Sequence, residues 1–102
     1  MPLSHPSGAE DRPLTLAAFQ EHIRERYAAA DGARGWAPTF AYLIEEVGEL
    51  ATALSGDDPV NLREEMADVL AWLCTLANIR GVDLTAAVTE KYLGDKPPTG
   101  TK

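Results

Sequence analysis

Hydrophobic residues recur three or four positions apart through most of this chain, and that spacing is typical of one face of an α-helix. The first run lies in residues 16–30 and contains Leu16, Phe19, Ile23 and Tyr27. Thr15 precedes the run and can act as its N-cap, because a threonine hydroxyl accepts a hydrogen bond from a free backbone N–H. Two glycines in residues 31–35 predict a loop, so the first helix should end near Ala30.

Two longer runs predict two further helices, and a short fourth run predicts a last one. The second helix should extend from about Pro38 to Leu54. Asp58-Pro59 then places an N-cap before a proline at the first helical position, which is a strong signal for the start of a third helix. Gly81 should end that helix, and Asp83 can cap the fourth one.

Four helices with short connections predict an all-α fold, a four-helix bundle, and the pattern contains neither strand alternation nor hairpin turns. We expect residues 14–96 to form this domain, with residues 1–13 as a flexible leader and residues 97–102 as a flexible tail. A chain of 102 residues with long amphipathic helices buries a modest fraction of its surface alone. We therefore expect homo-oligomerisation to complete the bundle.

Composition restricts the possible functions. Nine basic residues against sixteen acidic ones give a formal net charge of -7, which argues against a nucleic-acid polymer as partner. The single cysteine, Cys74, falls within a helical pattern, so neither a disulfide framework nor a thiolate zinc site is expected. No run approaches the ~20 apolar residues of a membrane span, and the N-terminus lacks the pattern of a signal peptide. These features predict a cytoplasmic protein without a membrane partner.

The second and third predicted helices each carry acidic residues three positions apart. Glu46 and Glu49 form the first pair, and Glu65 and Asp68 form the second. This spacing places the two members of each pair on neighbouring sites of one helix surface. A solvated helix face is the usual explanation for an acidic residue, and we expect it to hold for Glu64. The repetition of the pattern on two adjacent helices favours a metal site instead.

Both pairs lie beside the apolar stripe of their helix. The expected stripes are Leu43, Val47, Leu50 and Leu54 in the second helix, and Leu62, Val69, Leu73 and Leu76 in the third. Glu46 then lies at the margin of its stripe, and Glu65 lies among core residues. A buried carboxylate is costly without a positive partner, and neither stripe offers a suitably placed lysine or arginine. If the two helices pack antiparallel, the four carboxylates meet, and a divalent metal ion is the expected counter-charge.

The sequence Glu45-Glu46-x-x-Glu49, followed after fifteen residues by Glu65-x-x-Asp68, resembles the signature of the MazG-type all-α nucleoside triphosphate pyrophosphohydrolases. The resemblance covers most of residues 16–96, from Arg34-Gly35-Trp36 to Glu90-Lys91. It implies a MazG-like helical fold that assembles as a homodimer or homotetramer, and dependence on Mg²⁺, with Mn²⁺ as a substitute. Hydrolysis of a nucleoside triphosphate between the α- and β-phosphates would release a nucleoside monophosphate and pyrophosphate. House-cleaning of non-standard nucleotides is compatible with that activity.

The resemblance also implies roles for individual residues. The expected metal ligands are Glu46, Glu49, Glu65 and Asp68. Glu45 occupies a position that in some relatives is suspected of orienting or deprotonating the attacking water. Trp36 and Trp72 match aromatic positions that can line the base pocket, and Lys91 matches a basic position near the phosphates. Asp95, which we also expect at the substrate, stands where the family often has asparagine, and this departure leaves base selectivity open.

The residues alone leave several alternatives. On a helical wheel Glu45 points away from the metal edge, so a water activated by metal alone is an alternative to a general base. Trp36 and Trp72 can fill the core instead of contacting a base, and Lys91 can be an exposed lysine. The domain could also be a nucleotide sensor or interaction module that binds metal without turnover, or a structural dimerisation bundle. A di-iron bundle needs Glu-x-x-His motifs, which the two histidines of the chain do not supply.

Overall fold

The structure is a computed structural model that describes residues 13–95, so the predicted tail and all but the last residue of the predicted leader lie outside the described residues. The described part contains helices joined by short connections, and no strand. The helices are α1 (Leu16–Arg34), α2 (Trp36–Ser55), α3 (Pro59–Arg80) and α4 (Leu84–Tyr92). The predicted all-α class is therefore confirmed.

Three helices begin at side-chain caps that the sequence predicts. The Thr15 hydroxyl accepts a hydrogen bond from the backbone N–H of Ala18 at 3.0 Å at the start of α1. Asp58 caps α3 beside Pro59, and Asp83 caps α4 in the same way. Each cap satisfies backbone N–H groups that have no partner within the helix. These boundaries follow from contacts between residues two or three positions apart.

The loop predicted for residues 31–35 is wrong. Helix α1 continues to Arg34, and α2 begins at Trp36, two residues earlier than expected. Gly35 alone joins the two helices, with a φ angle of 82° that residues with a side chain rarely adopt. Asp31 consequently occupies a helical position in the last turn of α1 instead of a loop position.

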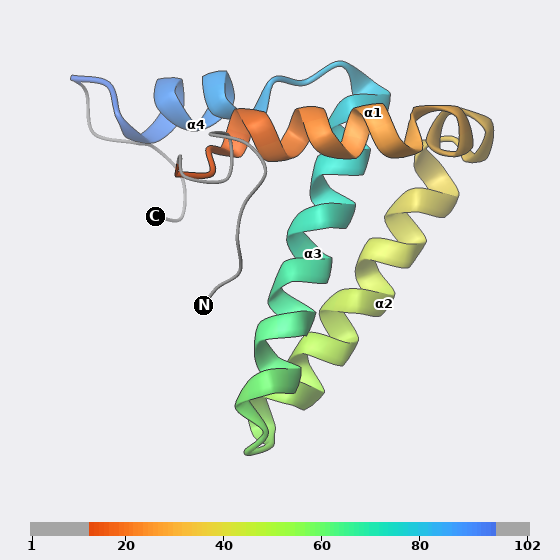
Figure 1. The fold of residues 1–102 in the computed structure, drawn as a ribbon, viewed down its shortest axis with the longest axis vertical. Coiled ribbons are helices and arrows are strands. Elements are labelled where there is room, and N and C mark those ends of the chain that lie inside the picture. The colour runs from red at the N-terminus through yellow and green to blue at the C-terminus, as the bar shows by residue number, and fades with distance from the viewer. Residues whose placement is uncertain (1–12, 96–102) are drawn as a thin grey trace, which may run out of the picture.

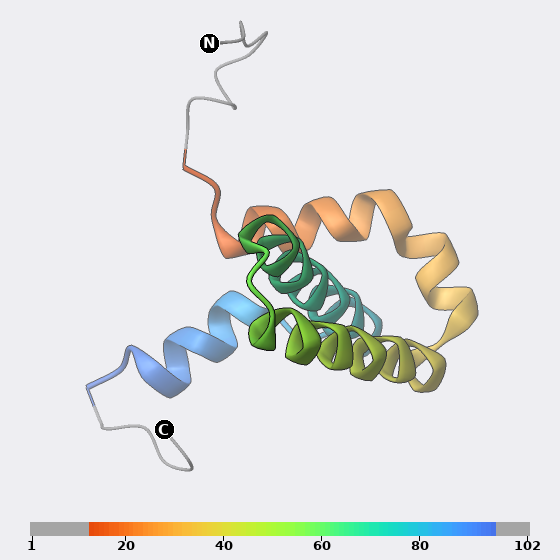
Figure 2. The same cartoon turned by 90° about the horizontal axis from the view of Figure 1, so that it is seen from below.

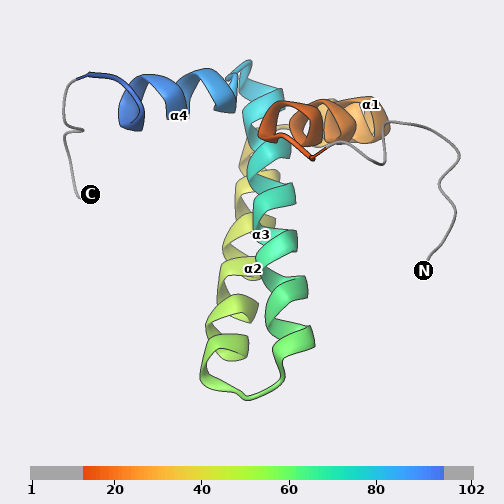
Figure 3. The same ribbon diagram turned by 60° about the vertical axis from the view of Figure 1, so that its left-hand side comes forward.

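Helices α2 and α3 form a hairpin and run side by side in opposite directions (Figure 1). Helix α1 crosses the open end of this hairpin, near the start of α2 and the end of α3, as the view from below also shows (Figure 2). Helix α4 is bent by 101° relative to α3 and projects away from the hairpin (Figure 3). Within residues 13–95, the outer faces of α2 and α3 have no neighbouring helix over most of their length.

The residues of α2 and α3 that face each other repeat with alternating spacings of three and four. They are buried or half-buried and comprise Thr39, Leu43, Glu46, Leu50 and Ala53 on α2, and Leu62, Glu65, Val69, Trp72, Leu76 and Ile79 on α3. This spacing keeps one face of each helix toward its partner along the whole hairpin. Each row thus carries one glutamate, Glu46 or Glu65, among mostly apolar residues.

The apolar stripes expected from the sequence are partly wrong. Val47, Leu54 and Leu73 remain 43%, 58% and 41% exposed, because they lie on outer faces of the hairpin. Helix α2 is apolar on two faces, and only one of them meets α3. The sequence pattern identifies both faces as apolar and does not distinguish the one that packs within the chain.

Helix α1 packs on α3, where both helices bury apolar residues, and a hydrogen-bond network joins them. Ile23 of α1 and Cys74 of α3 are both buried. The Gln20 side-chain amide donates hydrogen bonds to Asn78 Oδ1 at 3.0 Å and to the Val82 carbonyl at 2.7 Å. Its oxygen accepts from the backbone N–H of Leu84 at 3.0 Å. Gln20 thereby fixes the turn between α3 and α4 against α1.

Candidate functional site

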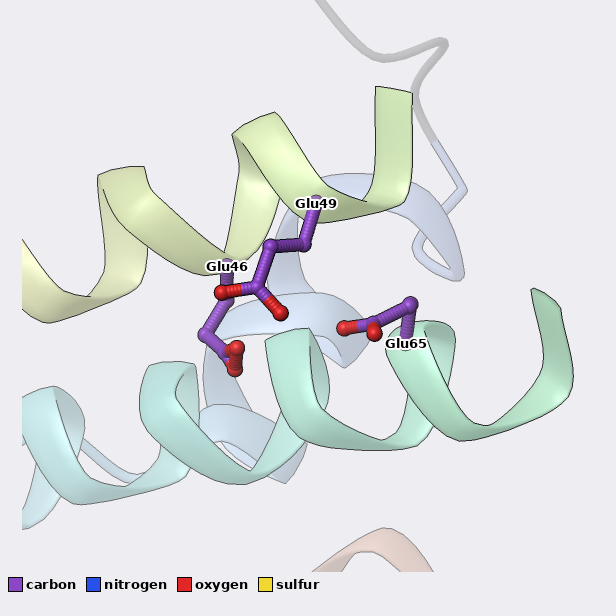
Figure 4. Close-up of side chains that lie close together, drawn as sticks. All are labelled: Glu46, Glu49 and Glu65. Atoms are coloured by element: carbon purple, nitrogen blue, oxygen red, sulfur yellow. The ribbon is translucent and has the colours of Figure 1, made fainter. Parts of the chain in front are cut away.

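Three glutamates from the two helices of the hairpin converge on one point. Glu46 and Glu49 come from α2 and Glu65 comes from α3, and Figure 4 shows the three carboxylates turned toward one another. Each residue offers one carboxylate oxygen, and these three oxygens lie within 4.8 Å of one another. The convergence arises because Glu46 and Glu65 occupy the rows that face each other, while Glu49 lies one turn beyond Glu46.

Glu65 carries the clearest sign of a missing partner. Its Oε1 atom is buried and has no hydrogen-bond partner among residues 13–95. Neither of the two ion pairs in residues 13–95 involves a residue of the glutamate cluster. An unsatisfied buried oxygen costs about 1–3 kcal/mol, and more when the group is charged. The cluster is thus a group of neighbouring carboxylates without a protein cation.

The surroundings disfavour the charged form of two members of the cluster. Partial burial, followed by the negative charge of Glu49, raises the pKa of Glu46 above its ordinary value. Partial burial also raises the pKa of Glu65, again with Glu49 as the largest charged contributor. Burial raises the pKa because the carboxylate loses hydration, and a nearby negative charge adds repulsion. A bound cation would reverse both effects.

Asp68 and Glu45, which the sequence also places at the site, lie at its edge. Asp68 is exposed on α3 one turn after Glu65, and its charge contributes to the raised pKa of both Glu46 and Glu65. Glu45 is exposed on α2 and contributes to the raised pKa of Glu46 as the last of the charged neighbours. Both residues are therefore close enough to affect the electrostatics of the cluster.

The oxygen atoms of the cluster fit a hard divalent cation. Ligand distances of about 2.0–2.6 Å around Mg²⁺ or Ca²⁺ place opposite oxygens about 4–5 Å apart, and the three glutamate oxygens lie within 4.8 Å of one another. Carboxylates are the oxygen donors that such ions prefer, and the buried Oε1 of Glu65 has a free acceptor site. The residues present therefore fit a divalent metal ion.

A second buried carboxylate lies in the last turn of α1. Asp31 is 4% exposed, and its Oδ1 atom accepts hydrogen bonds from the Arg34 guanidinium at 2.9 and 3.1 Å. Arg34 also donates to the hydroxyl of Thr39 at 3.0 Å, and that hydroxyl donates to the Gly35 carbonyl. The other oxygen of Asp31, Oδ2, is buried and has no hydrogen-bond partner in the described part of the chain. The spacing of Ile23, Tyr27 and Asp31 along one helix face is the sequence signal for this burial, which the predicted loop obscured.

Trp72 lines a cavity of about 320 Å³ together with Asp31 and Arg34. Its ring stacks on Tyr42 with the ring centroids 5.1 Å apart, and the Arg34 guanidinium lies 5.1 Å from its centroid. Stacking and cation–π contacts fix the orientation of the indole. Trp72 is therefore a rigid part of the cavity wall, one turn beyond Asp68.

The other residues expected at the substrate do not line this cavity. Trp36 is the first residue of α2 and is exposed. Lys91 lies on α4 with its ammonium nitrogen 5.4 Å from the ring centroid of Tyr92, and Asp95 is exposed after the end of that helix. Of the four residues expected at the substrate, all of which the structure describes, Trp72 alone lines this cavity.

No single helix among the described residues has the length and apolar character needed to cross a membrane. The bent pair formed by α3 and α4 passes that test by length and composition only.

The part of the chain that forms the glutamate cluster is similar in sequence to known proteins. Residues 36–97 match the family model of the MazG nucleotide pyrophosphohydrolase domain, a range that includes all of α2, α3 and α4. A dATP/dGTP diphosphohydrolase of Cyanophage S-2L is 37% identical to this chain over 79 residues. The aligned region covers 78% of this chain and 71% of the phage protein.

Proposed function

Because the chain belongs to the MazG nucleotide pyrophosphohydrolase family, we propose that its glutamate cluster is a Mg²⁺ site for the hydrolysis of a nucleoside triphosphate. The enzyme class, a nucleoside triphosphate pyrophosphohydrolase, follows from the matching domain and from the phage relative. The observation that carries the metal proposal is the buried, unpartnered Oε1 of Glu65 beside two further carboxylates.

The metal ligands in this proposal are Glu46, Glu49, Glu65 and Asp68. Bound Mg²⁺, or Mn²⁺ in its place, would neutralise the phosphates and lower the pKa of a bound water. The carboxylates by themselves repel a triphosphate, so the same residues that hold the metal exclude the substrate when the metal is missing. Asp68 is exposed one turn after Glu65, and its charge raises the pKa of both Glu46 and Glu65, which supports its place among the proposed ligands.

Glu45 is the proposed residue for orienting the attacking water. It is the exposed neighbour of Glu46 on α2, and its negative charge contributes to the raised pKa of Glu46. A positioned carboxylate that accepts a proton contributes typically 10²–10⁴-fold to a rate. Glu45→Gln should therefore lower kcat while leaving the affinity for Mg²⁺ unchanged. An equal loss of metal affinity would assign Glu45 to the ligands instead.

The phage relative suggests the class of substrate. Its name specifies dATP and dGTP, and we propose purine deoxynucleoside triphosphates for this chain as well. Trp72 would contact the base from its place in the cavity wall. Trp36, Lys91 and Asp95 remain proposed substrate residues that a second copy of the chain would bring to the site. If the enzyme removes non-standard nucleotides, we expect its kcat/KM to be higher for triphosphates with modified bases than for dATP and dGTP.

The exposed apolar face of α2 supports a homo-oligomer. This face contains four large apolar residues that are between 43% and 58% exposed, namely Phe40, Ile44, Val47 and Leu54. Together with Ala51 they are spaced alternately four and three positions apart along the helix. This is the spacing of a helix face that packs against another helix. We propose a homodimer or homotetramer in which a second copy covers this face.

Analytical ultracentrifugation tests the assembly. Ile44→Glu places a charge on the exposed face, and we expect it to shift the protein to the mass of one chain. Thr52→Glu changes an exposed residue of the same helix and serves as the control. A wild-type protein that sediments as a monomer at micromolar concentration would refute the proposed assembly.

Product analysis tests the reaction. We expect dATP or dGTP with Mg²⁺ to yield the deoxynucleoside monophosphate and pyrophosphate in equal amounts. Orthophosphate as the first product would refute the cleavage position, and tight nucleotide binding with no product would favour a sensor. In water enriched with ¹⁸O, attack at the α-phosphorus puts the label in the monophosphate, whereas attack at the β-phosphorus puts it in pyrophosphate.

A further inference from the structure

Tyr42 is the exposed member of an aromatic pair beside the carboxylate cluster. Its ring stacks on that of Trp72, with the centroids 5.1 Å apart and an angle of 22° between the ring planes. The Arg34 guanidinium also packs against the indole, 5.1 Å from its centroid. Tyr42 itself remains 46% exposed. The tyrosine therefore has surface that a ligand can reach, whereas two neighbours already pack on the indole.

The aromatic pair lies next to the acidic residues on both helices of the hairpin. Tyr42 precedes Glu46 by about one turn of α2, and its spacing of seven residues from Glu49 places the two on the same side of the helix. Trp72 follows Asp68 by about one turn of α3. Because the helices run in opposite directions, both aromatic residues lie from the acidic residues toward the open end of the hairpin (Figure 1).

The other direction along the hairpin offers no surface for stacking. Residues 43–71, which include the cluster and the closed end of the hairpin, contain no aromatic residue. A nucleotide whose phosphates lie at the cluster can extend toward either end of the two helices. Only toward the open end does it meet an exposed aromatic ring of the hairpin within about one turn, which is 6 Å along α2.

The contact with Trp72 makes Tyr42 well suited to hold a base. A side chain that a ligand must order loses rotamer freedom on binding, and a ring that is already stacked loses less. An aromatic ring accepts the face of any base, because every base has a π-face. Tyr42 and Trp72 thus form a fixed flat surface beside the place where the phosphates would bind.

We propose that the base of the substrate stacks on Tyr42. Trp72, in addition to its own place in the cavity wall, acts as a positioning residue that holds the tyrosine ring. This role rests on the proposed function, because it takes the phosphates of the substrate to be bound at the glutamate cluster. The signal in the amino-acid sequence is an aromatic residue four positions before Glu46 and seven before Glu49.

Substitutions of Tyr42 test the stacking contact with dATP and Mg²⁺. We expect Tyr42→Ala to raise KM about 5- to 150-fold, which is the usual effect of removing a stacked aromatic residue. The value of kcat should change little, because the base is held equally in the ground state and in the transition state. Tyr42→Phe retains the ring and should retain the wild-type KM. An unchanged KM in Tyr42→Ala would overturn the proposal.

A triphosphate without a base separates stacking from a structural role. The compound 1′,2′-dideoxyribose 5′-triphosphate carries the sugar and the phosphates only. It is measured both as a substrate and as a competitive inhibitor of dATP hydrolysis, so that its KM or its inhibition constant is obtained. We expect Tyr42→Ala to leave this value unchanged while it raises KM for dATP. An equal rise for both compounds would show that Tyr42 only supports the fold of the site, and would overturn the proposal.

Tyr27 distinguishes stacking on Tyr42 from entry of the base into the cavity. Tyr27 is also 46% exposed, but it lies on α1 and lines the cavity together with Trp72. A raised KM for dATP in Tyr27→Ala, together with an unchanged KM in Tyr42→Ala, would assign the base to the cavity and overturn the proposal. The opposite result would support stacking on Tyr42.

The failure of this proposal and the failure of the proposed function give different results. Release of pyrophosphate from no nucleotide at all would refute the proposed function. Release of pyrophosphate with an unchanged KM in Tyr42→Ala would refute only the role of Tyr42. Binding of α,β-methylene dATP with Mg²⁺, measured by isothermal titration calorimetry, tests that role without turnover, and its Kd should rise in Tyr42→Ala as KM does. Thermal melts establish that each variant is folded.

Discussion

Asp31 and Glu65 are both acidic residues on helix faces that pack against a neighbouring helix, yet their surroundings differ. Asp31 is 4% exposed, and the Arg34 guanidinium, three residues along the chain, lies 2.9 Å from its Oδ1 atom. Glu65 has a buried oxygen that finds no partner among the residues the structure describes, and its near neighbours include the carboxylates of Glu46 and Glu49. The carboxylate of Asp31 is paired with a cation of the same chain, whereas the carboxylate of Glu65 lies beside other carboxylates.

Asp31 is a carboxylate that the chain itself neutralises, whereas Glu65 belongs to a cluster that a bound cation would neutralise. A buried charge that is paired within the chain is tolerated in the folded state, because its counter-charge is always present, and removing that counter-charge is costly. A cluster of carboxylates without a counter-charge destabilises the metal-free fold and becomes favourable only when a cation binds. The first arrangement holds α1 at the start of α2, and the second provides the proposed metal centre. Substitutions at the two sites should therefore have opposite effects on stability.

The largest expected effect is the loss of activity in Glu65→Gln. This change removes a proposed ligand, and we expect kcat/KM to fall about a thousandfold, because charge stabilisation at the reacting phosphate is lost. The free energy of unfolding of the metal-free protein should stay equal or rise, since one repelling charge is removed. Glu64→Gln, at the exposed neighbouring position, should leave both quantities unchanged. Strong destabilisation of metal-free Glu65→Gln would contradict the comparison.

The next effect is the loss of stability in Arg34→Met. The substitution leaves Asp31 buried without a cation, and breaking a buried pair in this way costs about 3 kcal/mol in the free energy of unfolding. Chemical denaturation measures this change. Arg24→Met is the matched control, because the side chains of Arg24 and Glu21 remain 56% and 45% exposed, and the loss there should be below about 1 kcal/mol. Similar losses in the two variants would mean that the Asp31 pair adds no more than a surface ion pair.

A smaller effect should appear when metal is added to the wild-type protein. Binding to the folded state alone stabilises it by about 2.7 kcal/mol when free Mg²⁺ is a hundred times its Kd. Differential scanning calorimetry should show a rise in Tm with Mg²⁺ that KCl of equal ionic strength does not reproduce. Glu65→Gln should abolish the rise, whereas Arg34→Met should retain it. An unchanged wild-type Tm with millimolar Mg²⁺ would refute tight binding to the metal-free cluster.

The smallest effect is on the pH dependence of the metal-free protein. The pKa values of Glu46 and Glu65 lie above the ordinary 4.5, so the folded state binds these protons more tightly than the unfolded chain does. Their contribution to stability is present below pH 4.5 and is lost as the pH rises through the raised values. Compared with a Glu46→Gln/Glu65→Gln variant, the wild-type Tm should therefore decline over this range. Saturating Mg²⁺ should remove the decline.

The carboxylate cluster was largely predictable from the sequence, whereas the Asp31 site was not. Glu46 and Glu65 stand beside apolar positions at helical spacing, and antiparallel packing of neighbouring helices is common, so their convergence follows from local patterns. Asp31 precedes Gly32 and lies near Gly35, and these glycines indicate a loop. In the structure a single glycine makes the whole connection, and the helix carries Asp31 into the interior.

Helix boundaries at Thr15, Asp58 and Asp83 depend on hydrogen bonds that close within two or three residues, so the amino-acid sequence alone specifies them. Which apolar face of α2 is buried depends instead on its match to α3 and α1, whose surfaces come from distant parts of the chain. Val47 is as hydrophobic as a core residue but is exposed, while Glu46 beside it faces α3. Burial is a property of two surfaces in contact, and for that reason the folded arrangement of the helices, and not the periodicity of one helix, determines which carboxylates become functional.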